Sequence, residues 1–443
     1  MDDMRRDVLE QGLYRRAVEA AVWGMPAVNF EVMRDVLAPE GGGEFLYWSR
    51  LVDWKNKTLT PNPDLIYYMA FVDLADGPVV VDIPPGSDEH VLNGSLCNLW
   101  QVPLEDVGPF GADEGRGGRY LLLPPGYADE IPDGFIVLQS DTSGVYALLR
   151  SVLPHADQET LDAGLAYCEQ IGLYPLSEAV NPAATPRRDL HGTIVDTRIP
   201  YDIHFWKALD RVVQHEVWLP RDRAFAEMLR GLGIERGKPF APDAARIEVL
   251  ERAVQEAHEW LATVYRTEPD FAEGSHWFFP AQRDFIQGQA ENFTNGEVYP
   301  YTDRAVIYHM AFIGIKRLGI GQFYLVTVRD SNDELLRSDR SYRLRVPGGV
   351  PVSQYWSVTA YDGDDHTLIE GNTKYSVASQ APGLTVNDDG SVDVYFGPDV
   401  EPGREANNVP TGGAPTFELM FRFYGVGPEV LQKTWTLDDV QPR

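Results

Sequence analysis

The stretch LTPNPDLIYYMAFVDLADGPVVVDIPP, residues 59–85, decides the fold of the first half of the chain. It opens with Pro61 and Pro63, which bias the residues before them toward extended backbone. The run LIYYMAFVDL that follows has the composition and period of a strand. The alternation sends Leu65, Tyr67, Met69 and Phe71 to one face and Ile66, Tyr68 and Ala70 to the other. We therefore predict a core strand that follows a rigid turn.

Polar side chains stand where this turn becomes the strand. Asn62 and Asp64 alternate with the two prolines. Both residue types make turns by hydrogen-bonding to nearby backbone. Held rigidly at the mouth of a strand, they can equally contact a ligand. The sequence leaves both interpretations open, and the second makes this segment a candidate site.

Length and composition indicate more than one domain. The 443 residues are 44% apolar and 11% aromatic, and single cores stop growing beyond about 250–300 residues. Short β-rich runs punctuated by Gly and Pro alternate with helical texture, which begins at about residue 145 in the middle of the chain. We predict a helical segment at 1–44, a first β-sandwich domain at 45–150, a helical region at 151–300 and a second β-sandwich domain at 301–443.

Apolar spacings of three and four residues predict the helices. The first carries Leu9, Leu13 and Ala17 on one packed stripe and is expected to end near Gly24-Met25-Pro26. The clearest is ARIEVLERAVQEAHEWLATVYR, residues 245–266, and a further helix is expected over 302–317. The predicted fold class is α+β, with two antiparallel, jelly-roll-like β-sandwich domains, a helical N-terminus and a helical middle segment.

Charge excludes two classes of partner. The chain has 67 acidic and 38 basic residues, a formal net charge of −29. Nucleic acid and an anionic membrane surface would each require a basic stripe, and no segment provides one. No run of eighteen apolar residues and no secretory h-region is visible. We predict a soluble, cytoplasmic protein.

Several catalytic motifs are absent from the sequence. It contains no GxSxG and no P-loop, and Leu219 and Ala262 stand where two HExxH motifs would need their second histidine. Cys97 and Cys168 are the two cysteines, which excludes a disulfide scaffold and a structural zinc site. No cofactor is predicted.

An acidic turn raises the question of a metal. Asp362, Asp364, Asp365 and His366 lie within five residues. Their spacing fits neither an EF-hand nor a facial triad. We therefore favour a solvated turn over a metal site near Asp362 and His366.

Several segments together resemble a known two-domain arrangement. TPNPDLIYYMAFVDLADGPVVVDIPP, GGRYLLLPPGY and SDTSGVYALLRSV are similar to the bacterial domain of unknown function 1254, and YRLRVPGGVPVSQYWSVTAYD, NDDGSVDVYFG and FELMFRFYG are similar to domain of unknown function 1214. Leu65 departs from the usual threonine, and Val409 lies where the pattern has Trp-Leu. The resemblance implies β-sandwich domains around a cleft and brings no established reaction.

Candidate site residues fall in both halves of the chain. We interpret Asp64 and His309 as a catalytic acid–base pair, since histidine is the usual proton carrier near neutral pH. A satisfied core histidine is the competing interpretation of His309. Tyr67, Trp100 and Trp356 are expected to wall an apolar pocket. The substrate-binding candidates are Asn62, Tyr67, Trp100, Gln101, Tyr301, Arg304, Tyr355, Trp356 and Tyr361.

Three classes of function remain open. We favour an enzyme that acts on a small apolar or aromatic molecule by acid–base chemistry without a nucleotide cofactor, with hydrolysis as one option. The alternative is a non-catalytic small-molecule or carbohydrate binder with an aromatic-lined inter-domain cleft. The third is a structural protein whose β domains form homo-oligomer interfaces. The first two require the segment at 59–85 and the strand containing Tyr355 to face each other.

Overall fold

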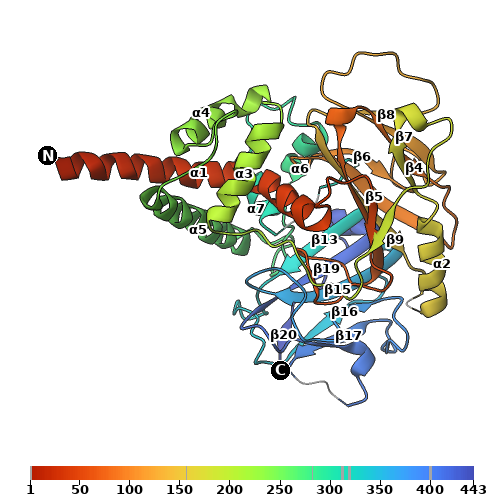
Figure 1. Cartoon of the computed structure of the whole chain (residues 1–443). Coiled ribbons are helices and arrows are strands. Elements are labelled where there is room, and N and C mark those ends of the chain that lie inside the picture. The colour runs from red at the N-terminus through yellow and green to blue at the C-terminus, as the bar shows by residue number, and fades with distance from the viewer. Residues whose placement is uncertain (1, 156, 282, 311–313, 318–320, 399–401) are drawn as a thin grey trace.

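The computed structural model describes residues 2–155, 157–281, 283–310, 314–317, 321–398 and 402–443 (Figure 1). Two β-rich lobes lie beside a group of helices, and the first turns of the N-terminal helix project away from the rest of the chain. The helices are α1 (Asp2–Leu37), α2 (Gln158–Cys168), α3 (Ile203–His215), α4 (Arg223–Leu232), α5 (Ala244–Arg266), α6 (Arg283–Ala290), α7 (Tyr301–Tyr308) and α8 (Pro428–Leu431).

Helix α1 is longer than its sequence indicates. It continues through Pro26 to Leu37, so the predicted end near Gly24-Met25-Pro26 is wrong. A proline inside a helix costs about 3 kcal/mol, and burial of the whole run from Ala20 to Phe30 offsets that cost. The predicted stripe also begins too early, because Leu9 is 75% exposed.

Of the two other helix predictions, one is confirmed and the other is too long. Helix α5 confirms the prediction at 245–266, and its apolar stripe is buried. The helix predicted at 302–317 is shorter, since α7 ends at Tyr308. Residues 311–313 of that prediction lie outside the described residues.

The first lobe contains two main sheets. The larger has the order β11-β1-β3-β9-β5-β6 and the smaller β10-β4-β7-β8, and a short ladder joins β12 to β2. The strands are β1 (Phe45–Tyr47), β2 (Asn56–Lys57), β3 (Leu65–Asp73), β4 (Val79–Ile83), β5 (Val91–Asn98), β6 (Pro103–Val107), β7 (Gly118–Leu123), β8 (Ile136–Gln139), β9 (Gly144–Val152), β10 (Gly172–Pro175), β11 (Arg187–Asp189) and β12 (Val195–Asp196).

Strand β3 confirms the predicted alternation. Tyr68 and Ala70 lie in a core between the two sheets of the first lobe. Tyr67 and Met69 point the other way, into a large core shared with α1, which we call the central core. The strand is buried on both faces because helices cover one side and a second sheet covers the other.

Two expectations for the first lobe are wrong. Residues 144–152 form the strand β9 between β3 and β5, not the start of a helical region. The run GVYALLRSV has no polar positions at helical spacing because both faces of this central strand are buried. The sheets are also not purely antiparallel, since β1 pairs in parallel with β11, and β7 with β8.

The second lobe again has two sheets around a core. Their orders are β13-β19-β15-β16 and β18-β17-β14-β20, with β17 and β18 parallel. In the segment TVNDDGSVDVYF, residues 385–396, a strand forms only after the Asp-Gly turn. The strands are β13 (Gln322–Thr327), β14 (Tyr342–Val346), β15 (Val352–Asp362), β16 (Ser376–Ala378), β17 (Val392–Gly397), β18 (Asn408–Pro410), β19 (Phe417–Val426) and β20 (Gln441–Pro442).

The fold is therefore mixed α+β with several sheets and a long N-terminal helix. The central core takes side chains from α1, α5, β3, β15 and β19, and so joins both lobes to the helices. Among the helices of the described ranges, none combines the length and the apolar character needed to cross a membrane.

A glycine after β6 gives a test of this packing. Gly108 has φ of +98°, and a Cβ atom there would lie 1.8 Å from the Leu92 carbonyl oxygen. Gly108→Ala is expected to lower the free energy of unfolding by at least about 3 kcal/mol, because left-handed strain and a backbone clash add. Gly192, at φ of +78° with open space, is the matched control. In urea denaturation Gly192→Ala should lose only about 1–2 kcal/mol; equal losses would contradict the close approach.

Candidate functional site

One face of the sheet β13-β19-β15-β16 is buried against the first lobe, and its residues are unusually polar for a buried surface. In β15 and β19, Trp356 and Phe421 point into the core of the second lobe, where their rings stack. The alternate residues point the other way. We call this set the junction face: Tyr324 of β13, Tyr355, Ser357, Thr359 and Tyr361 of β15, and Glu418, Met420, Arg422 and Tyr424 of β19.

Asn62 connects the first lobe to the junction face. Its Nδ2 donates to the hydroxyls of Tyr355 at 2.9 Å and Tyr424 at 3.0 Å. Its Oδ1 accepts from the Asp64 backbone N–H at 3.0 Å, which makes the turn. Its own backbone N–H donates to the Tyr67 hydroxyl at 2.8 Å. The residue therefore acts as a turn-maker and as a contact between lobes at once, and the segment at 59–85 does meet β15.

Asp64 brings a carboxyl group to this junction, in addition to the buried Glu418 of β19. The Ser376 hydroxyl donates to its Oδ1 at 2.5 Å. Its Oδ2 is sealed from solvent and has no hydrogen-bond partner among the described residues. Burial raises the pKa of Asp64, against the hydrogen bond from Ser376 and the charge of Arg422. Burial also lowers the pKa of nearby Lys374 to about 8, against the attraction of Asp64. Both groups are thus shifted toward their neutral forms.

Arg422, which is buried, and Arg150, which is partly exposed, lie in the same layer. Arg422 donates to Thr359 Oγ1 at 2.9 Å, to the Thr60 carbonyl at 3.1 Å and to the Tyr361 hydroxyl at 2.5 Å. Arg150 of β9 lies 5.8 Å from the Tyr67 ring centroid. No carboxylate in the described part of the chain comes within 4 Å of either guanidinium. The junction therefore holds two cations without a paired anion.

Aromatic rings enclose these charges. The Tyr355 and Tyr424 rings stack with centroids 4.4 Å apart. The Arg422 guanidinium lies 5.6 Å from the Tyr324 ring and 5.5 Å from the Tyr361 ring. The Tyr361 hydroxyl donates to the Pro61 carbonyl at 2.6 Å. Together with Tyr67, these residues make five tyrosines that line the junction on both sides.

A group of histidines lies at the other end of the junction face. Glu418 accepts from Tyr265 at 2.9 Å and pairs with His366 Nδ1 at 2.9 Å. The His309 ring centroid lies 5.2 Å from that of His366 and 5.4 Å from that of Tyr265. Burial lowers the pKa of His309, and the neighbouring His366 lowers it further. Burial and His366 likewise lower the pKa of His258 to about 4.

His309 has a defined tautomer. Its Nδ1 lies 2.5 Å from the Val306 carbonyl oxygen. Because a carbonyl oxygen only accepts, Nδ1 carries the proton and Nε2 is an acceptor. That Nε2 is buried and has no partner within the described ranges. No hydrogen bond or ion pair joins His309 to Asp64, so the structure does not pair them.

The remaining substrate-binding candidates divide by position. Tyr67, Tyr355 and Tyr361 join Asn62 at the junction. Trp356 faces the opposite side of β15, since neighbours in a strand point to opposite faces. Trp100 and Arg304 lie together beside α1, with the guanidinium 4.7 Å from the Trp100 ring.

Gln101 and Tyr301 have structural contacts. Gln101 is fully buried at φ of +59°, and its Nε2 donates to the Pro26 carbonyl at 2.9 Å and to Asn29 Oδ1 at 2.7 Å. Its Oε1 accepts from Tyr146 at 3.0 Å, which satisfies the side chain. The Tyr301 hydroxyl donates to Glu19 at 2.7 Å near the surface of α1. Neither residue contacts the junction face through these bonds.

The sequence did not indicate Arg150, Arg422, Glu418 or Tyr424 as site residues. The signal lies in FELMFRFYG, where apolar and polar residues alternate. Alternation is typical of a strand with one face in water. All ten residues of β19 are buried, so the polar face meets another part of the protein.

Across the residues with assigned positions, no group of three or more His, Cys, Asp or Glu side chains could hold a metal ion. Asp365 instead pairs with Arg198 at 2.8 Å, and His366 with Glu418. Asp362 accepts the Asp364 backbone N–H at 2.9 Å, as a turn-maker does.

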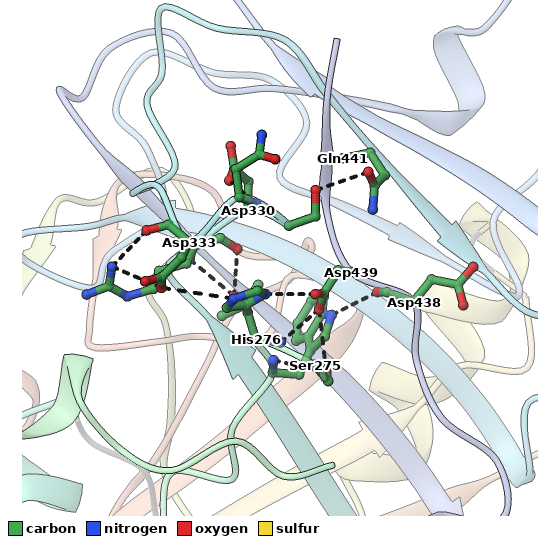
Figure 2. A network of polar contacts seen from close by, with 12 residues as sticks. Ser275, His276, Asp330, Asp333, Asp438, Asp439 and Gln441 are labelled. Carbon is green, nitrogen blue, oxygen red and sulfur yellow. Dashed lines mark hydrogen bonds and ion pairs between the residues drawn. The ribbon is translucent and has the colours of Figure 1, made fainter. Parts of the chain in front are cut away.

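A second polar network ties the C-terminal segment to the loop after α5. Figure 2 shows His276 between Asp439 and Asp333, with Nδ1 2.7 Å from Asp439 Oδ2 and Nε2 4.0 Å from Asp333 Oδ1. Asp439 also accepts the His276 backbone N–H at 2.8 Å. An open pocket of about 540 Å³ lies beside Ser275 and Asp439. Because His276 and Asp439 bind each other directly and link two segments of the chain, we assign this network a structural role.

Comparison with known proteins agrees with this division into lobes. Residues 42–175 match the family "Protein of unknown function (DUF1254)", and residues 321–428 match "Protein of unknown function (DUF1214)". Comparison with curated proteins gave no match.

Two solved structures are similar to the chain. The crystal structure of the VPA0106 protein from Vibrio parahaemolyticus superposes with a TM-score of 0.60 at 18% identity, covering 97% of this chain and 100% of the other. A putative uncharacterized protein from Burkholderia cenocepacia gives a TM-score of 0.44 at 13% identity, covering 98% and 94%. At this identity the Vibrio structure supports the fold alone. The chain belongs to the two-domain family in which DUF1254 is followed by DUF1214.

Proposed function

We propose that the protein is an enzyme that acts on a small aromatic or apolar molecule by acid–base chemistry at the junction face, without a nucleotide cofactor. The observation that carries the proposal is the unpaired charge of this buried layer. Arg150 and Arg422 have no carboxylate partner, and Asp64 Oδ2 has no hydrogen-bond partner, in the described part of the chain. A layer that served only to join two lobes would be apolar, since unpaired buried charge is costly.

The geometry favours a role for each group. Asp64 and Lys374 are the proton-transfer groups, because burial raises the pKa of Asp64 and lowers that of Lys374 to about 8, and a catalytic pKa shifted toward the working pH is efficient. Arg422 and Arg150 would attract a polar or anionic end of the substrate. The tyrosine rings would contact its apolar body. His309 Nε2 is a further acceptor at the far end of the face.

The proposal includes the β-sandwich architecture of the two lobes. Each lobe has two sheets around one core, as a β-sandwich does. A jelly-roll-like pair of sandwiches would place the tyrosine-lined junction between two rigid bodies. Rigid walls would then hold the proton-transfer groups in position during the reaction.

A library experiment tests the proposal. The protein is mixed with a set of small aromatic and aliphatic metabolites, thermal shifts identify binders, and mass spectrometry of the mixture identifies products. For a compound that is converted, Asp64→Asn is expected to reduce turnover by about 10²–10⁴-fold, the usual contribution of a positioned acid or base. Binding should remain, because asparagine can still accept from Ser376.

The control is Asp388→Asn, which removes the same charge at an exposed position. It should leave turnover and binding unchanged. A thermal shift without any product would support the second candidate, a non-catalytic binder, which the fully hydrogen-bonded Asn62–Tyr355–Tyr424 group favours. Full turnover by Asp64→Asn would end the assignment of Asp64.

A further inference from the structure

A second group of buried, unpaired donors lies beside α1. Arg304 of α7 is fully buried, and its Nη2 donates to the Trp23 carbonyl at 2.8 Å. Its Nε and Nη1 have no partner among the residues that the structure describes. The guanidinium lies 4.7 Å from the Trp100 ring and 5.0 Å from the Tyr299 ring. An arginine with two unused donors in a dry site is costly unless something else binds there.

A second arginine shares the same tyrosine. The Arg221 guanidinium lies 5.1 Å from the Tyr299 ring, and its Nη1 donates to the Asn292 carbonyl at 2.8 Å. Its Nε and Nη2 are buried and lack partners within the described ranges. These two donors form one edge of the guanidinium, the edge that binds a carboxylate through two parallel hydrogen bonds. The Tyr299 hydroxyl is also buried and unpartnered there.

Asp222 interacts electrostatically with Arg304 and Arg221, and Asp141 forms an ion pair with Arg221, but neither acid accepts a hydrogen bond from these donors. Asp222 Oδ1 is occupied by the indole N–H of Trp23 at 2.8 Å. The closest Asp141 oxygen lies 3.7 Å from Arg221 Nη2, beyond hydrogen-bonding distance. That carboxylate accepts from Asn292 at 2.8 Å instead. Two donor groups of Arg221, two of Arg304 and the Tyr299 hydroxyl therefore lie around the Tyr299 ring without a hydrogen-bond acceptor among the described residues.

Aromatic rings surround the group. Trp23 lies 4.8 Å from Trp100 and stacks on Phe225 at 5.0 Å. Phe293 lies 5.8 Å from the Arg221 guanidinium and 5.2 Å from the Tyr299 ring. Flat apolar walls around cationic donors suit a ligand that is planar at one end and anionic at the other.

We propose that Arg221, Arg304 and Tyr299 bind the carboxylate of a small aromatic acid, with its ring against Trp100. This site is separate from the junction face and does not depend on the function proposed there. The carboxylate would accept from Nε and Nη2 of Arg221 and from the unused donors of Arg304. The Tyr299 hydroxyl would donate to the same group.

Benzoate is the probe that tests this site. Titration of the full chain is expected to change tryptophan fluorescence, because the ligand lies against Trp100. Benzamide, which has the same ring and no charge, should not bind. Arg221→Gln is expected to weaken benzoate by about 10-fold or more, the usual effect of losing a hydrogen bond to a charged group. Tyr299→Phe should weaken it by about 2–13-fold through loss of one neutral hydrogen bond.

Two controls separate this site from the rest of the molecule. Arg340→Gln changes an exposed arginine on the second lobe and should leave benzoate binding intact. Asp64→Asn should also leave benzoate binding intact, because Asp64 belongs to the junction. If the function proposed for the junction face is wrong, the benzoate test is therefore unaffected. Should Arg221→Gln not fold, Tyr299→Phe, which removes a single oxygen atom, decides the question. Equal binding of benzamide, no benzoate binding to the wild-type chain, or unchanged affinity in Tyr299→Phe would overturn the proposal.

Discussion

Arg422→Ala is expected to lower the free energy of unfolding by about 3–5 kcal/mol, because the substitution removes three hydrogen bonds and leaves a cavity in a sealed layer. The acceptors left behind are Thr359 Oγ1, the Thr60 carbonyl and the Tyr361 hydroxyl. The Thr60 carbonyl belongs to the first lobe, so the loss weakens the contact between lobes as well as the second lobe itself.

Urea denaturation measures this loss. Arg340→Ala is the matched control, since Arg340 pairs with Glu334 on the surface at 2.6 Å. An exposed pair contributes less than about 1 kcal/mol. A loss of similar size in both variants would show that the junction does not depend on Arg422.

Glu418→Gln is expected to cost about 3 kcal/mol at pH 6 and to change how stability depends on pH. Burial lowers the pKa of His366, but Glu418 more than compensates, and the folded value is raised above the ordinary value of about 6.5. A raised value means that the His366–Glu418 contribution is fully present below about pH 6.5 and is lost as pH rises through the folded value. Glutamine keeps an acceptor for Tyr265 but removes the charge that holds the proton on His366.

Thermal unfolding between pH 5 and 9 checks this expectation. Wild-type stability should fall as pH rises above about 6.5, and this component of the fall should disappear in Glu418→Gln. Glu130→Gln, at an exposed loop position, should follow the wild-type profile. Parallel profiles for wild type and Glu418→Gln would contradict the assignment of a charged pair.

Local sequence patterns predicted the elements whose surroundings agree with their period. The alternation in β3 and the apolar stripe of α5 are both present in the structure. The end of α1 was not predictable, because Pro26 is a strong local stop signal that burial of the helix among α3, α4, α5 and α7 overrides. Local rules fail at this position because the stabilising contacts come from residues far away in the sequence.

Some of the candidate residues lie together at the junction for a related reason. The residues that lie together are Asn62, Asp64, Tyr67, Tyr355 and Tyr361. The sequence signal was a pair of rigid polar residues at the start of a strand, and that strand forms as predicted. Trp356 was included through its proximity in sequence to Tyr355, although a period of two separates their directions. Arg422 was missed because an alternating strand predicts contact with water, and only the docking of another lobe turns that face inward.

The central core determines whether the two matched segments could be separated by protein engineering. Ala17 of α1, Met69 of the first lobe and Tyr424 of the second belong to one continuous apolar cluster. Neither matched segment, 42–175 or 321–428, encloses that cluster by itself. We therefore expect the two segments to unfold together in one cooperative transition, and a substitution in the core of either segment to lower the stability of both.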